Sequence, residues 1–157
     1  MAYARTDLEP WAWLKSVGTQ EEPLRRDWRQ TETNLLTEAI FTKHPRSMRQ
    51  GDFLIYYAVG HGSLVAIGEV ASDEVDPRHE DPKRFKWKMQ VNPLVSLDLR
   101  GAPHLTQTPI QPTSVRRQSH IRVTNEAFNV ARDLILEAVD LIIPRELGTN
   151  DNQGDRS

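Results

Sequence analysis

The sequence predicts a single α+β domain, a small mixed β-barrel with flanking helices and a C-terminal amphipathic helix. Apolar runs rich in β-type residues fill the middle of the chain, while sustained helical spacing of apolar residues occurs near its end. No internal repeat or composition change divides the chain. We expect the domain to cover residues 1–143 and residues 144–157 to form a disordered tail, because little beyond Leu147 could join a core.

The first predicted element is a strand over residues 11–17, a short apolar run that ends before Gly18. Residues 19–43 mix helix-forming residues with polar ones that break helices. We expect one or two short helical turns there, with a loop around Trp28.

The strongest local signal is an antiparallel hairpin. A turn at Gly51 and Asp52 leads into the apolar run 53–59, and a glycine-flanked loop joins it to a second apolar run, 64–70. Both runs are apolar at nearly every position, which indicates burial on both faces, as in the wall of a small barrel.

The segments after the hairpin alternate between loop and strand. Residues 73–86 contain two prolines and no periodicity, so they should form a solvated excursion. Residues 87–99 predict a strand, in which Pro93 requires an edge, a bulge or a bend because it lacks an N–H group. Residues 100–112 carry three prolines and are expected to be a loop.

A basic segment, residues 114–124, leads into the predicted helix. Asn125 can cap this helix, and Pro144 is expected to end it. Apolar residues recur along one face of the helix, at Ala127, Phe128, Ala131, Leu134, Ile135, Ala138, Val139 and Ile142.

The composition excludes several classes of protein. Without cysteine, disulfide folds, thiolate zinc sites and cysteine nucleophiles are excluded. Twenty basic and 22 acidic residues give a formal net charge of −2, so a nucleic acid would have to bind through a local patch and a pocket.

The sequence contains no run of about 18 apolar residues, the length that a membrane-spanning helix needs. Asp7 and Glu9 lie where a secretory signal would be apolar, and we expect a cytoplasmic protein with no membrane partner.

Motifs for metals, cofactors and catalysis are missing from the sequence. No two of its five histidines have the i, i+2 or i, i+4 spacing that directs two imidazoles to one ion. Neither a G-x-S-x-G motif nor a glycine-rich phosphate loop is present. We therefore expect no metal, no cofactor and no catalytic residue.

Aromatic residues supply the first binding candidates. Trp28 lies among charged residues, so its ring either folds back over the barrel as a lid or offers a face on which a planar base stacks. Alternation along the hairpin strand should send Tyr56 or Tyr57 into the barrel and leave the other ring toward its mouth. Alternatively, the rings of both tyrosines belong to the core.

Polar residues supply the second group. Lys15 and Ser16 end the first strand, either as a solvated terminus or as donors at a pocket rim. Residues 116–122 form a dense basic segment in which alternation sets Arg117 and Ser119 on one face and His120 on the other. Such a row suits phosphate oxygens, although many basic segments are only solvated surface.

The order of these motifs resembles the EVE domain family of the PUA-like superfamily. It comprises W-L-K-S, a tryptophan-centred polar segment, R-x-M-R-x-G-D-F-L-I-Y-Y, L-V-A-I-G-E-V, K-W-K-M-Q-V and S-V-R-R-Q-S-H-I-R-V-T before a helix. The match covers roughly residues 11–140, and its sharpest part is residues 48–70.

The resemblance implies a PUA-like barrel related to YTH domains, a non-catalytic module whose aromatic pocket takes a modified base flipped out of DNA or RNA. By position it implies Trp28 as the stacking wall and Trp87 as a structural residue. The other implied pocket residues are Lys15 and Ser16 at the edge, Tyr57 and Ala58 in the lining, and Arg117 and Ser119 in the closing segment. This chain departs from the family at Val17–Gly18 and Ala58–Val59, where hydrogen-bonding groups are lost.

Two other functions remain open. The related ASCH domains include small amidohydrolases acting on modified nucleosides, but their G-x-K-x-x-E-x-R pattern is absent here. Alternatively, the apolar face of the C-terminal helix could dock a protein partner. No feature of the sequence predicts an oligomeric state.

Overall fold

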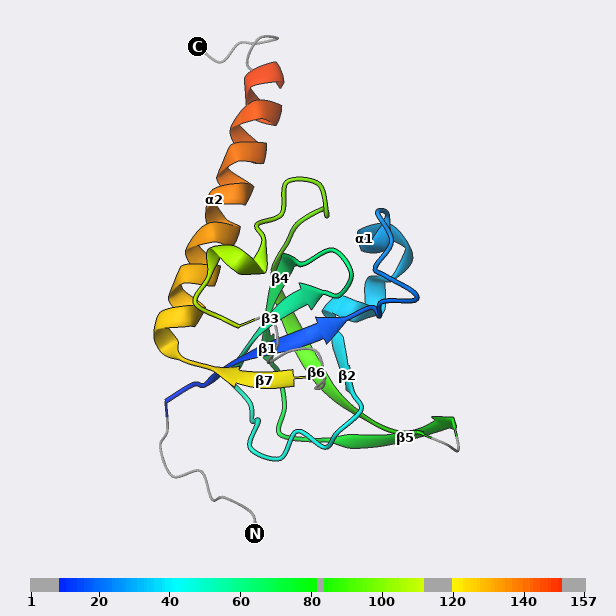
Figure 1. Cartoon of the computed structure of the whole chain (residues 1–157). Helices are drawn as coiled ribbons and strands as arrows, with labels where there is room; N and C mark the ends of the chain where they lie inside the picture. Colours follow the sequence, from blue (N-terminus) through cyan, green and yellow to red (C-terminus); the bar gives the residue numbers. More distant parts are fainter. Residues whose placement is uncertain (1–8, 82–83, 112–119, 151–157) are drawn as a thin grey trace.

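The computed structural model describes residues 9–81, 84–111 and 120–150. They form an α+β fold in which one curled mixed sheet of seven strands is flanked by a long C-terminal helix and short helical turns (Figure 1). The elements are β1 (Ala12–Val17), α1 (Trp28–Thr31), η1 (Thr33–Leu36), β2 (Glu38–Phe41), β3 (Phe53–Ala58), β4 (Ser63–Val70), β5 (Asp76–Asp81), β6 (Arg84–Ser96), η2 (Leu105–Gln107), β7 (His120–Val123) and α2 (Asn125–Asn150).

The strand order in the sheet is β2-β6-β4-β3-β1-β7, and β5 pairs with β6 outside this path. β1 and β3 are parallel, and the other pairs are antiparallel. Within the described residues no backbone pairing joins β2 to β7. The predicted barrel is therefore a curled sheet that remains open between these two edge strands.

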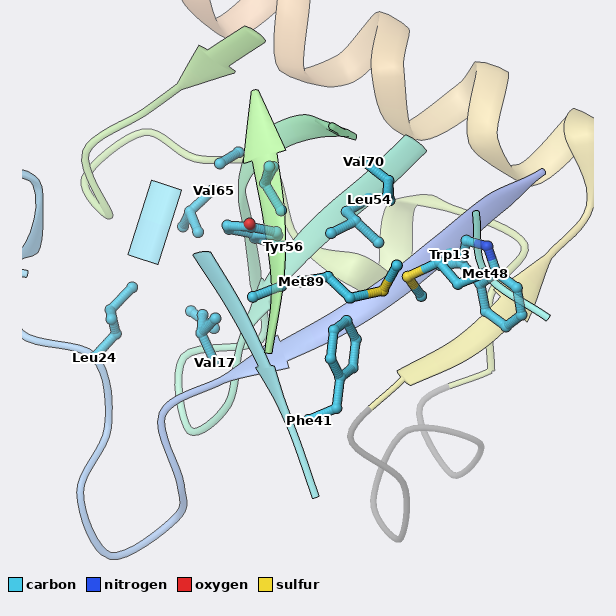
Figure 2. Packing of buried hydrophobic residues seen from close by; sticks show 14 of the residues in the cluster. Trp13, Val17, Leu24, Phe41, Met48, Leu54, Tyr56, Val65, Val70 and Met89 are labelled. Atoms are coloured by element: carbon cyan, nitrogen blue, oxygen red, sulfur yellow. The ribbon is translucent and has the colours of Figure 1, made fainter. Parts of the chain in front are cut away.

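Alternation along the strands produces two cores, one on each face of the sheet. Trp13 and Val17 of β1 join Leu54 and Tyr56 of β3 in a core on the concave face (Figure 2). On the other face the core includes Leu14 and Ile55 and is covered by α2, which contributes Ala127, Ala131, Ile135 and Ala138. The two apolar faces explain why the strand sequences lack polar alternation.

The predicted hairpin is confirmed. β3 and β4 pair antiparallel, with an irregularity in register between Tyr56 and Tyr57. In the connecting loop Gly62 has φ 73°, and a Cβ atom there would lie 2.3 Å from His104 Nε2. The positive φ favours glycine at this position, and any side chain there would also displace the exposed ring of His104.

The turn before β3 delivers a buried carboxylate to the start of β1. Asp52 is fully buried and accepts hydrogen bonds from the Trp11 backbone N–H at 3.0 Å, Trp13 Nε1 at 3.0 Å and the Arg49 backbone N–H at 3.1 Å. A buried carboxylate needs such donors to offset the loss of hydration. Asp52 thus fixes the indole of Trp13 relative to the sheet.

Several predicted elements need correction. The segment 19–43 contains the strand β2 as well as helical turns, and α1 begins at Trp28 where a loop was predicted. The predicted excursion 73–86 contains β5 and the start of β6. Pro77 is compatible with β5 because, among the described strands, β5 pairs with β6 alone, so its other edge needs no N–H donors. The irregularity predicted at Pro93 is confirmed, since the register shifts beside its partner Gly68.

The C-terminal helix is longer than predicted. α2 begins at Asn125, and the side chain that caps it is that of Thr124, whose Oγ1 accepts from the Ala127 backbone N–H at 3.1 Å, and not that of Asn125 as predicted. The helix continues through Pro144 to Asn150, and in Figure 1 its C-terminal part extends beyond the sheet. An interior proline removes one hydrogen bond and crowds the carbonyl of residue i−4, but the residues on either side of Pro144 are helical here. Among the residues that the structure describes, no helix has the length and apolar character needed to span a membrane.

Candidate functional site

The open side of the sheet carries a cluster of rings around a lysine, which we call the seam and define as Trp13, Lys15, Phe41 and His120. The centroids of the Phe41 and His120 rings lie 5.0 Å apart in an edge-to-face arrangement, and those of Trp13 and His120 lie 5.7 Å apart. Because Phe41 ends β2 and His120 begins β7, ring contacts join these two edge strands, between which the described residues show no strand pairing.

Strand pairing brings these residues onto one face. β1 and β7 are antiparallel, with Lys15 opposite His120 and Trp13 opposite Arg122. Directly opposed residues of neighbouring strands point to the same side of a sheet. Lys15, His120 and Arg122 therefore belong to the concave face, together with Trp13.

Lys15 is the most unusual residue of the seam. It is only 6% exposed, its Nζ donates to the backbone oxygen of Ser16 at 2.5 Å, and it lies 5.3 Å from the centroid of the Phe41 ring. In the described part of the chain no carboxylate forms an ion pair with it. Burial lowers the pKa of Lys15 to about 8, because the apolar surroundings disfavour the ammonium ion.

His120 complements this lysine. Its pKa is lowered to about 4, chiefly by burial and further by the positive charges of Lys15 and Lys43. At neutral pH the imidazole is uncharged, so one ring nitrogen is a donor and the other an acceptor. The seam thus combines a buried cation, a neutral ring with both hydrogen-bonding functions, and two carbon-rich aromatic rings.

The predicted pocket residues divide between the two faces of the sheet. Lys15 and the fully buried Ala58 lie on the concave side. Ser16 and Tyr57 are register partners in β1 and β3, and Tyr57 packs against the core under α2. Alternation explains this division, since neighbouring residues of a strand point to opposite faces.

Trp28 lies inside the concave core and has no exposed surface. This position agrees with the ring folded over the barrel and corrects the expectation of an open stacking wall. The charged residues that flank Trp28 lie at the surface, where Arg25 pairs with Asp27 and Arg29 pairs with Asp98. The indole is therefore buried while its charged neighbours stay in solvent. Its Nε1 is buried and has no hydrogen-bond partner among the described residues.

Three further predictions concern residues around the seam. Arg117 and Ser119 lie outside the described residues. Trp87, expected to be structural, packs against the concave core, with its ring 4.6 Å from that of His44. Of the two neighbouring tyrosines, Tyr56 is the one that lies inside the barrel-like sheet.

Sequence reasoning missed Phe41 and the role of His120. Phe41 fell in a segment predicted to contain helical turns, and its strand has only four residues. His120 was placed on the face opposite Arg117, and that alternation was the available signal. Among the described residues no three histidine, aspartate or glutamate side chains gather as metal ligands.

Comparisons with known proteins bear on the fold. No family model matches the chain, and no curated protein matches it. The solved structure of Rpa0253 from Rhodopseudomonas palustris is similar, with 18% identity, a TM-score of 0.52, and coverage of 80% of this chain and 92% of that chain. This likeness shows a shared fold.

Two more distant structures were also found. Atu2648 from Agrobacterium tumefaciens has 18% identity and a TM-score of 0.49, covering 78% of this chain and 91% of that chain. The YTH domain of the MRB1 protein from Zygosaccharomyces rouxii, in complex with N6-methyladenosine RNA, has 10% identity and a TM-score of 0.45, covering 87% of this chain and 91% of that chain.

Proposed function

We propose that this chain is an EVE domain of the PUA-like superfamily and a non-catalytic nucleic-acid-binding module. In this proposal one modified base, flipped out of DNA or RNA, enters the seam between β2 and β7. The order of the sequence motifs supports the family assignment, and the curled mixed sheet is compatible with it.

The observation that carries the proposal is the buried ammonium group of Lys15 against the Phe41 ring. A buried charge is costly unless it has partners that replace its hydration. Lys15 is hydrogen-bonded to one backbone oxygen, whereas an ammonium group has three donors. A ligand with carbonyl oxygens or ring nitrogens would supply the additional acceptors, and nucleobases carry both.

The rings of the seam favour a planar ligand over an aliphatic one. Stacking of a base on an aromatic side chain contributes about 1–3 kcal/mol by alanine substitution. The imidazole of His120 adds a neutral polar ring beside Lys15, and the edges of bases present hydrogen-bonding groups. A base that is already modified or unpaired costs less to extract from a duplex, which favours it as the occupant.

The weak joint between β2 and β7 supports entry at this place. The two strands meet through side-chain rings and not through backbone pairing in the described residues. Parting the strands therefore breaks no ladder of backbone hydrogen bonds. Since Lys15 is nearly buried in the free protein, we infer that Phe41 and His120 move apart when the base enters.

The remaining predicted pocket residues take supporting places in this proposal. Ser16, Tyr57 and Ala58 fix β1 against β3 beside Lys15, and Trp28 fills the core of the same face. Arg117 and Ser119 precede His120 in the sequence by three residues and by one residue, and they lie outside the described residues. We retain both as candidates for contacts that close the site.

A titration with matched oligonucleotides tests the proposal. Single strands that differ at one base, unmodified or modified, are compared with the same strand lacking that base. The proposal expects binding to depend on the base and this dependence to be lost in Lys15→Met. Lys88→Met is the control, because Lys88 pairs with Glu38 at 3.5 Å outside the seam. Equal binding of all strands, abolished by salt, would refute the pocket.

Amide hydrolysis is the second candidate, and the lowered pKa of Lys15 is the observation that favours it. A lysine amine that is partly neutral near pH 8 can act as a base or nucleophile. Release of the acyl group from an N-acylated cytidine, lost in Lys15→Met and retained in Lys88→Met, would assign this activity instead.

A further inference from the structure

The guanidinium group of Arg122 lies over the face of an indole at the outer end of the seam. The centre of its guanidinium group lies 3.4 Å from the centroid of the Trp11 ring, which is a stacking distance. Trp11 is itself fixed, since it is nearly buried and its backbone N–H donates to Asp52. The indole against which the guanidinium group lies is therefore in place before any ligand arrives.

Arg122 differs in its surroundings from other arginines of the chain. Arg25, Arg29 and Arg132 each have a carboxylate oxygen within 3.3 Å, from Asp27, Asp98 and Asp133 respectively. Arg122 is exposed, and in the described part of the chain it has an aromatic partner but no carboxylate partner. Stacking occupies the face of a guanidinium group and leaves the N–H donors at its edge, which match two oxygens of a phosphate.

The position of Arg122 relative to Lys15 suggests which phosphate it binds. Arg122 lies two residues from His120 on the same face of β7, a step of about 7 Å along a strand. Lys15 is directly opposite His120 on the neighbouring strand. The guanidinium group of Arg122 and the ammonium group of Lys15 are therefore diagonal neighbours on the concave face, on adjacent strands and two residues apart in register. Within one nucleotide, a single sugar separates the base from its phosphate.

We propose that Arg122 binds the phosphate attached to the nucleotide whose base occupies the seam, so that the site takes a nucleotide unit and not a free base or nucleoside. The inference rests on the proposed function in placing the base beside Lys15. The phosphate contact itself requires only Arg122 and Trp11, which allows the two claims to be tested separately.

The experiment measures binding of two labelled single strands, one carrying the modified base and one abasic at that position, over a series of salt concentrations. Arg122→Gln should weaken both strands by the same factor, about fivefold to tenfold, and should reduce the salt dependence by about one phosphate contact. Arg132→Gln, which removes a guanidinium that lies near the Phe128 ring but pairs with Asp133, should leave both unchanged.

A conservative variant separates orientation from charge. Arg122→Lys keeps the positive charge but lacks the planar pair of donors, so we expect it to recover only part of the lost affinity. A midpoint of thermal unfolding equal to that of the wild type shows that each variant is folded. Should Arg122→Gln lower the midpoint, Arg122→Lys serves as the deciding variant.

The outcomes distinguish the inference from the proposed function. If Arg122→Gln behaves like Arg132→Gln while base dependence persists, the phosphate contact is refuted and the pocket remains. If both strands bind equally but Arg122→Gln weakens them, the base pocket is refuted and the phosphate contact remains. A nucleoside that binds as tightly as its monophosphate would also overturn the inference.

Discussion

The rings of Phe41 and His120 meet edge to face, with an angle of 83° between their planes, and join the two edge strands of the sheet. Phe41 also lies beneath the ammonium group of Lys15. One ring thus contacts both polar groups of the seam. In the proposed function, Phe41 is therefore the residue that couples entry of the base to exposure of Lys15.

Replacing Phe41 by leucine should separate packing from aromatic contact. Leucine fills much of the same space, so we expect less than about 1.5 kcal/mol loss in the free energy of unfolding. The base-dependent part of binding should fall by about 1–3 kcal/mol, because the aromatic face is gone. Urea unfolding and oligonucleotide titration of the same sample measure the two effects. Unchanged base dependence would exclude Phe41 from the site.

Replacing Lys15 by methionine should stabilise the protein while removing base binding. The folded-state pKa of about 8 lies below the ordinary value of 10.5, so at pH 7 the chain carries a buried charge that methionine avoids. We expect a gain of about 1–3 kcal/mol in the free energy of unfolding.

The pH dependence of this gain has a defined sign. Between about pH 8 and 10.5 the unfolded chain binds the Lys15 proton more tightly than the folded chain, so the wild type gains stability as the pH rises. The advantage of Lys15→Met should therefore shrink over this range. A constant difference between pH 7 and 10 would show that Lys15 is hydrated in the folded protein.

His120 should make the fold sensitive to mild acid. Its pKa is lowered to about 4 from 6.5, so the stability linked to the neutral ring is complete above about pH 6.5. That stability is lost as the pH falls toward 4. His120→Asn should lose less free energy of unfolding than the wild type over this range. Parallel stability curves for the two proteins would contradict the burial of this ring.

Asp52 should be the polar residue whose loss is most damaging at the start of β3. In Asp52→Asn the new amide group must direct its NH₂ at one of the N–H donors of Trp11, Trp13 or Arg49. An unsatisfied buried donor costs about 1–3 kcal/mol. Urea unfolding measures the loss, and Asp98→Asn on the exposed surface is the control. Equal midpoints for the two variants would contradict this role.

Much of the fold was predictable because its signals are local. The first strand and the hairpin are confirmed, and the C-terminal helix is confirmed apart from its cap residue and its end. Each of them depends on an apolar run with a turn or a cap beside it. β2 was missed because it is four residues long. Its partner β6 lies about fifty residues away in the sequence, so only long-range pairing stabilises it.

The site was less predictable than the fold. Lys15 was a candidate because a lysine at a strand end could be a donor, but its contact with Phe41 arises from the curl of the sheet. No pattern along the chain reports that curl. Trp28 was a candidate because its sequence neighbours are charged. Those neighbours form ion pairs at the surface, whereas the ring packs inside the core.

The most direct test of the account compares one base with no base at the seam. Affinities of the wild type, Lys15→Met and Lys88→Met are measured for a strand with a modified base and for the same strand abasic at that position. We predict at least a tenfold preference for the base in the wild type and Lys88→Met, and no preference in Lys15→Met. Equal preference in all three proteins would contradict the assignment of the seam as the base-binding site.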